Sequence, residues 1–423
     1  MPAPNEPSAQ NHSGAQNDVS AASEASQPSA TTLPAASAAR DVTDASAERA
    51  HRARSGRRAE MLPGLLLIAA TGVALVLANS AASGAWHGVV EARLGPLTVH
   101  EWVAEWLLAV FFFVTGVELR EEFSRGSLST PRRALTPIMA ALGGMVVPAV
   151  IFVAFTAGGS AAHGWAIPTA TDIAFAVSLL ALVAPGVPAP ARAFLLALAV
   201  ADDLFAMIVL AVFYTPGLHP TIVAVVLGLL IGPWVRPRLR RMLEQLSVWI
   251  VVPAFALVSA GVPLWGGGAG EVSDAAVGAG DAGEVSDAAV VAGGAGALAL
   301  GADPVFFGVF LGLVVGKPVG IILATWIVQR IGRAWSVSRA RRAGTAVVQR
   351  TSASVSWPDL WVVALLAGVG FTMSLLVAQL AFSGGGADAV LHTEHATLGV
   401  LAASFVAPVL AGISYRLLRR RRK

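Results

Sequence analysis

The segment FLLALAVADDLFAMIVLAVFY, residues 194–214, decides the fold class, because it is apolar throughout except for Asp202 and Asp203 near its middle. About 20 apolar residues are enough to cross a bilayer as an α-helix. Similar runs recur from Met61 to the C-terminus, and they are continuous rather than alternating. Since only helices and closed barrels satisfy their backbone in lipid, the sequence predicts an all-α polytopic membrane protein.

The composition also indicates a membrane protein. Of the 423 residues, 55% are hydrophobic and only 13% are charged, whereas a soluble domain carries about 25% charged residues. The absence of cysteine excludes disulfides and thiolate metal sites. The net charge of +3 would fit nucleic-acid binding, but the arginines lie between the apolar runs, where membrane topology explains them. We therefore expect a lipid bilayer, and no nucleic acid, as the partner.

Ten apolar runs are candidate membrane spans. The connections between them alternate between arginine-rich and arginine-poor segments. Because arginine is retained on the cytoplasmic side, this alternation predicts that both termini are cytoplasmic. The predicted spans are 61–80, 103–119, 135–157, 166–185, 192–214, 219–235, 246–263, 304–329, 359–382 and 396–416.

Three segments flank or interrupt the predicted membrane domain, which covers residues 61–418. Residues 1–60 have almost no large apolar side chain, which predicts a disordered cytoplasmic tail. Residues 266–302 contain GEVSDAAV twice and predict a flexible insert facing outside, with a calcium site at its aspartates as the less favoured alternative. Residues 419–423 form a basic cytoplasmic tail.

Three predicted spans carry charged residues at membrane depth. Asp202 and Asp203 lie roughly midway along one span, Lys317 lies at a comparable depth in another, and Asp172 lies in a third. Such a charge costs at least about 2.5 kcal/mol to insert, so it persists for function or with a partner. A single aspartate such as Asp172 also fits a hydrogen-bonded packing role.

The adjacent carboxylates Asp202 and Asp203 predict a site for protons or cations. They point about 100° apart on a helix, so one can face Lys317 while the other faces a water-filled cavity. Repulsion and burial favour proton binding at one of them, and a small cation could compete for that position. Lys317 is one of two lysines in an arginine-rich chain, and a buried lysine can lose its proton where arginine cannot.

Two spans contain interruptions typical of discontinuous helices. Facing half-helix ends bring like dipoles together, and a nearby aspartate or lysine could neutralise them. A glycine at every fourth residue, from Gly308 to Gly320, predicts close approach of another helix beside Lys317. The interrupting residues are Pro168, Thr169, Thr171, Gly368, Gly370, Thr372 and Ser374.

These stretches resemble the NhaA family of sodium/proton antiporters. The matching segments are AVFFFVTGVELR (109–120), GWAIPTATDIAFA (164–176), FLLALAVADDL (194–204), GKPVGI (316–321) and GVGFTMSL (368–375), within a likeness that runs from residue 61 to about residue 415. The resemblance implies the NhaA-like antiporter fold, with inverted repeats and broken helices. It also implies exchange of Na⁺ or Li⁺ for H⁺ across the bacterial inner membrane by alternating access. Such exchange regulates intracellular pH and sodium, without a cofactor.

The resemblance also implies roles for individual residues. Asp203 would bind Na⁺ or Li⁺ and the exchanged proton, together with Asp202, which would form a switchable pair with Lys317. A homodimer is one assembly that the resemblance allows. The other implied site residues are Thr171 and Asp172 at the crossing of the broken helices, Pro168, Gly368, Gly370 and Thr372 in support of it, Glu118 and Glu122 near a cytoplasmic funnel, and His219.

The sequence departs from the family pattern at three places. Two membrane helices that the family has between the equivalents of Thr215 and Gly217 are missing, which predicts ten spans in place of twelve. Arg240 and Glu244 stand where the family has an acid and a histidine tied to pH activation, so that response is not carried over. Phe205 replaces a glycine beside the aspartate pair and would narrow the cavity.

Other functions stay open from the sequence. The missing helices allow a relative that no longer transports. An intramembrane aspartyl protease would need Asp172 and Asp203 to share a proton, but the Gly-x-Gly-Asp pattern of such proteases is absent. His392 and His395 have the spacing of metal ligands, but no third ligand is near them in the sequence, which favours a solvated loop.

Overall fold

The computed structural model describes residues 60–124, 126, 129–214, 220–264, 303–343, 355–383 and 386–421. All of them belong to one compact unit, Gly56–Lys423. The predicted N-terminal tail up to residue 59, the predicted insert 266–302 and His219 lie outside the described residues.

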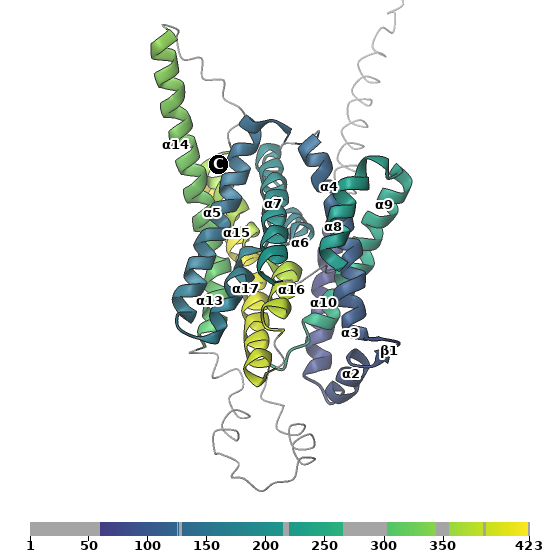
Figure 1. Cartoon of the computed structure of the whole chain (residues 1–423). Coiled ribbons are helices and arrows are strands. Elements are labelled where there is room, and N and C mark those ends of the chain that lie inside the picture. Colours follow the sequence, from purple (N-terminus) through teal and green to yellow (C-terminus); the bar gives the residue numbers. More distant parts are fainter. Residues whose placement is uncertain are drawn as a thin grey trace, which may run out of the picture. The chain divides into compact units, whose positions relative to one another are not determined.

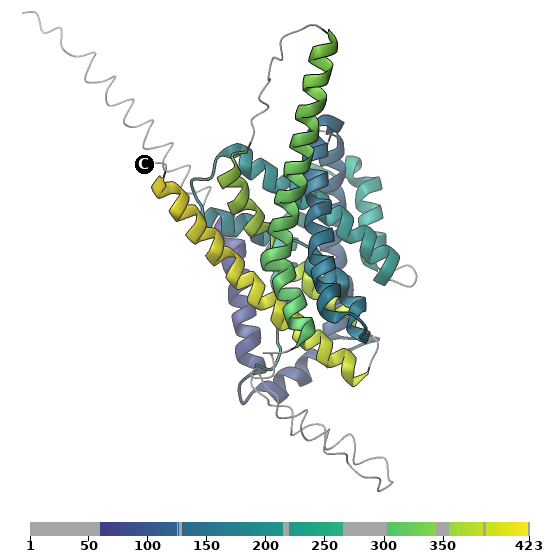
Figure 2. The ribbon, with the colours of Figure 1, turned by 90° about the vertical axis from the view of Figure 1, so that its left-hand side faces the viewer.

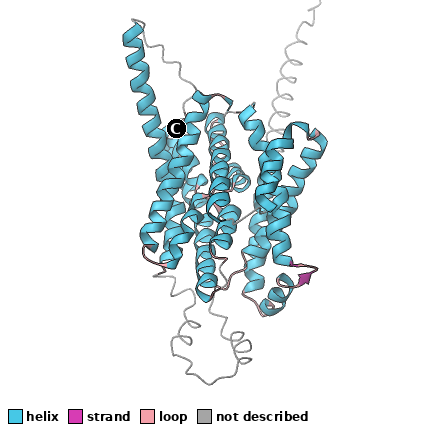
Figure 3. Cartoon of the chain, in the orientation of Figure 1, coloured by secondary structure: helices cyan, strands magenta, loops and turns pink. Residues whose placement is uncertain are grey.

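Helices make up almost all of the described chain (Figure 3). One short antiparallel pair of strands, β1 (Arg93–Leu94) and β2 (Leu97–Thr98), is an exception to the all-α prediction. The turn between them needs Gly95, whose φ of 75° lies in the left-handed region that glycine adopts without a steric penalty. The hairpin is local and leaves the helical architecture unchanged.

Among the described residues, seven helices are long and apolar enough to cross a membrane, and two bent pairs raise the number of spans to nine. The bent pairs are η3 (Ser160–Thr169) with α6 (Ile173–Val183), and α15 (Trp357–Ala367) with α16 (Phe371–Ala381). Their bends of 53° and 43° fall at the two predicted interruptions, which confirms the broken helices. The remaining predicted span is a shorter apolar helix, Ile222–Trp234.

The seven unbroken spans are Glu60–Ala78, Val99–Ser124, Ala134–Thr156, Ala189–Tyr214, Pro237–Ser259, Pro304–Ala334 and Asp388–Arg420. Several contain segments of π-helix, labelled η like the 3₁₀ segments. The elements not yet named are α2 (Ser83–Val90), α3 (Val99–Glu101), η1 (Trp102–Leu107), α4 (Leu108–Ser124), α5 (Pro131–Thr156), α7 (Ala189–Val209), η4 (Leu210–Tyr214), α8 (Pro220–Ile231), η5 (Gly232–Trp234), α9 (Pro237–Leu246), η6 (Ser247–Val251), α10 (Val252–Ser259), α13 (Pro304–Leu311), η8 (Gly312–Gly316), α14 (Lys317–Ala343) and α17 (Ala387–Arg421).

The helices form two groups in contact with each other. One group holds α4, α8, α9 and α10, and the other holds α5, α13, α14, α15 and α17. Figure 1 shows α7 and α16 between these groups. An apolar cleft of about 160 Å³ separates α7 from the α4–α8 pair, and Phe112, Leu204, Met207 and Val225 line it. Neither Asp202 nor Asp203 lines this cleft, so it is a different space from the cavity that Phe205 is expected to narrow.

The helix Glu60–Ala78 is attached to a different part of the unit at each end. At its C-terminal end, the Asn79 side chain donates to the carbonyl oxygen of Val262 at 2.9 Å and accepts from the backbone N–H of Leu264 at 2.6 Å, just after α10. At its other end, Glu60 pairs with Arg192 of α7 at 2.6 Å. The first span therefore bridges the end of α10 and the start of α7.

Glycines bring α5 and α14 into backbone contact. A Cβ atom at Gly320 would overlap the carbonyl oxygen of Gly143, and one at Gly316 would press on the backbone of Pro148. Figures 1 and 2 both show α14 running beside α5. The predicted close approach along the Gly308–Gly320 stripe is confirmed, and its partner is mainly α5.

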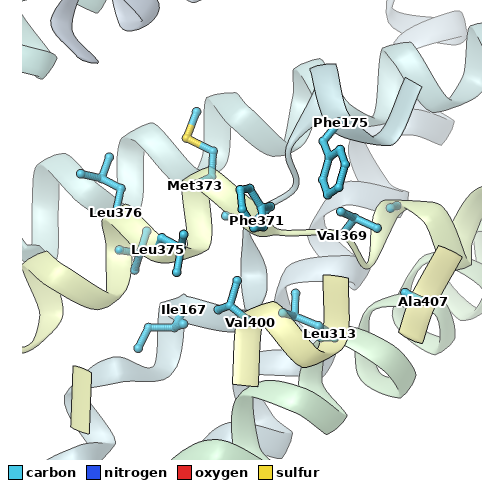
Figure 4. Packing of buried hydrophobic residues seen from close by; sticks show 14 of the residues in the cluster. Ile167, Phe175, Leu313, Val369, Phe371, Met373, Leu375, Leu376, Val400 and Ala407 are labelled. Atoms are coloured by element: carbon cyan, nitrogen blue, oxygen red, sulfur yellow. The ribbon is translucent and has the colours of Figure 1, made fainter. Parts of the chain in front are cut away.

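Buried apolar side chains surround the break between α15 and α16. Phe371, the first residue of α16, packs against Phe175 of α6 with ring centroids 5.4 Å apart. Val369 and Leu313 are fully buried beside them (Figure 4). The irregular backbone at the break is thus enclosed by protein, which is the condition under which it can exist at membrane depth.

We expect Gly320→Ala to destabilise the protein by about 1–3 kcal/mol, because the added methyl group must displace the α5 backbone. Gly332→Ala is the matched control on the same helix, since nothing lies within 4 Å of its Cβ position. The control should be neutral or slightly stabilising through helix propensity. Thermal unfolding in detergent measures both, and equal midpoints for the two variants would contradict the packing explanation.

Candidate functional site

The two broken helices cross at their breaks and satisfy each other's polar groups. The backbone N–H of Asp172 donates to the carbonyl oxygen of Val369 at 2.9 Å. The Thr171 hydroxyl donates to the carbonyl oxygen of Ala367, also at 2.9 Å. Each break therefore supplies hydrogen-bonding groups that the other would otherwise leave unpaired in an apolar environment.

Asp172 lies at the N-termini of α6 and α16, the second half-helix of each broken span. As the N-cap of α6, its carboxylate accepts from the backbone N–H of Phe175 at 3.0 Å. Its other oxygen accepts from the Thr372 hydroxyl at 2.5 Å and from the Thr372 backbone N–H, in the first turn of α16, at 3.4 Å. A carboxylate there stabilises two positive dipole ends at once. This geometry fits both the predicted crossing position and a structural role.

Lys317 supplies the opposite charge. It begins α14 directly after the π-helical segment η8, and its side chain is only 1% exposed. The ammonium donates to Oδ2 of Asp202 at 2.7 Å and to the carbonyl oxygen of Thr169, the last residue of η3. One cation thus joins α7 to the C-terminal end of a half-helix, where positive charge is favourable.

Asp203 lies beside this pair, and one oxygen of its carboxylate has no partner in the part of the chain that the structure describes. Its side chain is 3% exposed, and Oδ1 of Asp203 and Oδ1 of Asp202 both lack a hydrogen-bond partner among the described residues. Asp203 is also within electrostatic range of Asp172 and Glu118. Buried acceptors without partners are rare and call for an explanation. Two such oxygens on adjacent residues can accept a proton or coordinate a small cation.

Glu118 and Glu122 lie toward the end of α4, where Glu118 is exposed and Glu122 half-buried. Between them in sequence, Glu121 forms an ion pair with Arg240 of α9, which also pairs with Glu244 at 2.6 Å. Sequence reasoning missed Glu121, because its partner lies on another helix. The pair connects α4 to α9 within one helix group.

The two histidines with metal-ligand spacing lie in helix α17, so the expectation of a solvated loop was wrong, and they have separate partners. His395 Nδ1 lies 2.8 Å from Oδ2 of Asp303, and the His392 ring packs on Phe382 with centroids 5.3 Å apart. Burial alone would raise the pKa of Asp303, but hydrogen bonds from His395 and from the Phe306 backbone outweigh it and lower the pKa. Asp303 is the N-cap of α13, so this contact joins the helix that leads to Lys317 to α17.

The chain was compared with known proteins. Residues 56–235 and 285–415 match the family model described as Na⁺/H⁺ antiporter 1. A Na⁺/H⁺ antiporter NhaA of Frankia casuarinae is 36% identical, with 86% of each chain covered. A Na⁺/H⁺ antiporter NhaA 1 of Frankia alni is 39% identical over 86% of this chain and 89% of its own. A Na⁺/H⁺ antiporter NhaA 2 of a Mycobacterium species (strain KMS) is 39% identical over 90% and 92%.

We expect Lys317→Met to reduce the free energy of unfolding by about 3 kcal/mol, because it leaves the Asp202 carboxylate buried without its counter-charge. Methionine keeps most of the side-chain volume, so the loss reports on charge rather than on a cavity. The double variant Asp202→Asn/Lys317→Met should recover a large part of that loss. Thermal unfolding in detergent tests this, and a double variant no more stable than the single one would contradict the pairing.

Proposed function

The chain belongs to the NhaA family of Na⁺/H⁺ antiporters, and we propose that its exchange of Na⁺ for H⁺ takes place at Asp203 and the neighbouring Asp202–Lys317 pair. It is a multi-pass membrane transporter and not an enzyme. The supporting observation is the buried Asp203 carboxylate, which has an unpartnered oxygen next to a lysine already engaged by Asp202.

Charge balance explains why such a site exchanges one ion for the other. The Asp202–Lys317 pair is neutral, so the site is also neutral when Asp203 carries either a proton or Na⁺. An empty site would leave a buried, uncompensated carboxylate, which is strongly unfavourable at membrane depth. The free-energy cost of moving the site from one side of the membrane to the other is therefore low only when Asp203 carries an ion. That condition couples the movement of Na⁺, or Li⁺, to the movement of H⁺.

Oxygen atoms on the residues next to Asp203 and Asp172 in the sequence are candidates to complete the coordination of a hard cation. The free Oδ1 of Asp202 is adjacent in sequence, and the Thr171 hydroxyl, whose proton is given to Ala367, keeps its oxygen lone pairs as acceptors. The broken helices hold this threonine beside Asp172, with Pro168, Gly368, Gly370 and Thr372 shaping the crossing. Alternating access then follows from movement of the two helix groups around a site at the midplane.

Both termini are proposed to be cytoplasmic, in a bacterial inner membrane. Arginines cluster at the start of α9, at the end of α14 and at the end of α17. Figure 1 shows these three places at the same end of the bundle, with β1 and α2 at the other end. This asymmetry fits the positive-inside rule. We also propose intracellular pH and sodium regulation as the role, and a homodimer as an assembly that light scattering in detergent can test.

A transport-inactive relative is the second candidate. The observation in its favour is that only five residues, 215–219, separate η4 from α8 in the sequence, where the resemblance implies that two family helices are missing. Sodium-driven proton movement in inside-out vesicles separates the two functions. Exchange above the level of empty vesicles supports the antiporter, and its absence in correctly inserted protein supports the inactive relative.

Asp203→Asn should abolish sodium-driven proton exchange, because an amide can neither bind the exchanged proton nor balance a cation. Asp388→Asn is the matched control, since Asp388 is an exposed aspartate in the first turn of α17. The assay is proton movement in inside-out vesicles, with insertion checked by immunoblot. Exchange retained by Asp203→Asn would place the site elsewhere.

Cation affinity should weaken as pH falls, by up to about tenfold per pH unit where the site is protonated, because binding one ion excludes the other. Sodium binding to purified protein must then release protons. Titration calorimetry in two buffers of different ionisation enthalpy measures that release. Heats independent of the buffer, with an affinity that does not change from acidic to alkaline pH, would show that the two ions do not share this site.

A further inference from the structure

We propose that Tyr214 is a positioning residue for ion exchange: its hydroxyl holds the half-helix η3 in register with the aspartate helix, so that the Thr169 carbonyl and Asp202 stay on the same ammonium group. The inference rests on the proposed exchange site. Tyr214 ends η4, the continuation of α7, and is buried.

The Tyr214 hydroxyl bridges two backbone groups of η3. It donates to the carbonyl oxygen of His163 at 2.5 Å and accepts from the backbone N–H of Ala166 at 3.4 Å. These two groups are three residues apart, which is the spacing that a 3₁₀-helix pairs directly. The hydroxyl therefore takes part in the hydrogen bonding of η3 itself, and ties that segment to the end of the α7 span.

Two connections now join the same pair of elements. In the first connection, the Tyr214 hydroxyl is hydrogen-bonded to the backbone of His163 and Ala166. In the second, the Lys317 ammonium lies between the Thr169 carbonyl and the Asp202 carboxylate. On η3 the acceptors His163 and Thr169 are six residues apart, or roughly 12 Å at about 2 Å per residue. The packing of η3 against α5 and α16 sets its general position. The two separated connections act in addition to that packing, and they set the register of η3 along α7.

The aromatic rings near Tyr214 add contact area without setting this register. The His163 ring lies 5.0 Å from the Tyr214 ring, and Trp165 packs edge-on against Phe213 at 5.5 Å. A phenylalanine at position 214 would keep such ring contacts. It would lose only the hydroxyl, leaving the His163 carbonyl and the Ala166 N–H free to pair with each other, away from α7.

A change of register would act on ion binding. If η3 shifts along α7, the Thr169 carbonyl moves relative to Lys317, and Thr171, two residues further on, moves relative to Asp203. The cation site then fits its ion less well, while the proton needs only the Asp203 oxygen. The balance between the two ions therefore moves toward the proton. The effect falls on affinity and on pH dependence, with the maximal rate largely kept.

The chain offers a matched control, because it contains only two tyrosines, Tyr214 and Tyr415. Tyr415 lies on α17, against Gly186. Tyr214→Phe, Tyr415→Phe and the unsubstituted chain are compared in inside-out vesicles over a range of sodium concentration and pH. Sodium binding is measured in parallel by calorimetry on the purified full-length proteins, with thermal unfolding as a check of folding.

For Tyr214→Phe, the apparent KM for sodium should rise about three- to tenfold, as expected for the loss of one hydrogen bond. Half-maximal exchange should move to more alkaline pH by about half to one unit, since a tenfold change in relative affinity corresponds to one unit. Tyr415→Phe should leave both values unchanged. Calorimetry should show the same loss of sodium affinity in Tyr214→Phe.

Two results would overturn the proposal. One is an unchanged KM, pH profile and calorimetric affinity in Tyr214→Phe. The other is a fall in maximal rate alone that matches a fall in the amount of folded protein. That result would show that the hydroxyl only stabilises the fold. If the unsubstituted chain itself shows no sodium-driven proton movement, the proposed function fails. Calorimetric sodium affinity then still decides whether Tyr214 positions a cation site.

Discussion

A single buried ammonium group holds the centre of this molecule together. Lys317 donates to Asp202 on α7 and to the end carbonyl of η3, so three elements from distant parts of the sequence meet on one charge. At membrane depth neither the lysine nor the aspartate could remain charged alone. The arrangement of α7 and α14 and the break after Thr169 each depend on this shared cation, and each places a constraint on the others.

Close packing of the surrounding helices also stabilises the Asp202–Lys317 pair. Gly316 and Gly320 flank Lys317 and bring the α5 backbone against it, while Phe175, Phe371 and Val369 enclose the neighbouring break. Close packing keeps the local dielectric low, and a low dielectric strengthens the Asp202–Lys317 attraction and penalises any unpaired charge. The unpartnered Asp203 oxygen is therefore costly unless an ion arrives. In the exchange that we propose, the preference for the loaded site comes from the whole enclosure rather than from one carboxylate.

Much of this could be predicted from the sequence, because charges in apolar runs and Gly or Pro interruptions are local signals. The depth of Asp202, Asp203 and Lys317 predicted the pair, and the residues around Pro168 and Gly368 predicted the two breaks. The rest depends on tertiary placement. The acceptor at Thr169 is a backbone carbonyl, and because every residue has one, the sequence cannot predict this contact. Tyr214 stands at a span end, where tyrosine is common at membrane interfaces, so its contact with η3 has no distinguishing pattern. The Glu121 contact likewise joins separate helices.

The first span has a mechanical consequence of its own. The Asn79 side chain attaches the C-terminal end of this span to the segment after α10 through two hydrogen bonds, of which it donates one and accepts the other. The Glu60–Arg192 pair at the other end is 36% and 38% exposed, and such a pair contributes at most about 1 kcal/mol. If α7 shifts along the membrane normal relative to α10, the weaker attachment yields first. The helix Glu60–Ala78 then pivots about its C-terminal attachment at Asn79, while its N-terminal attachment at Glu60 can be released.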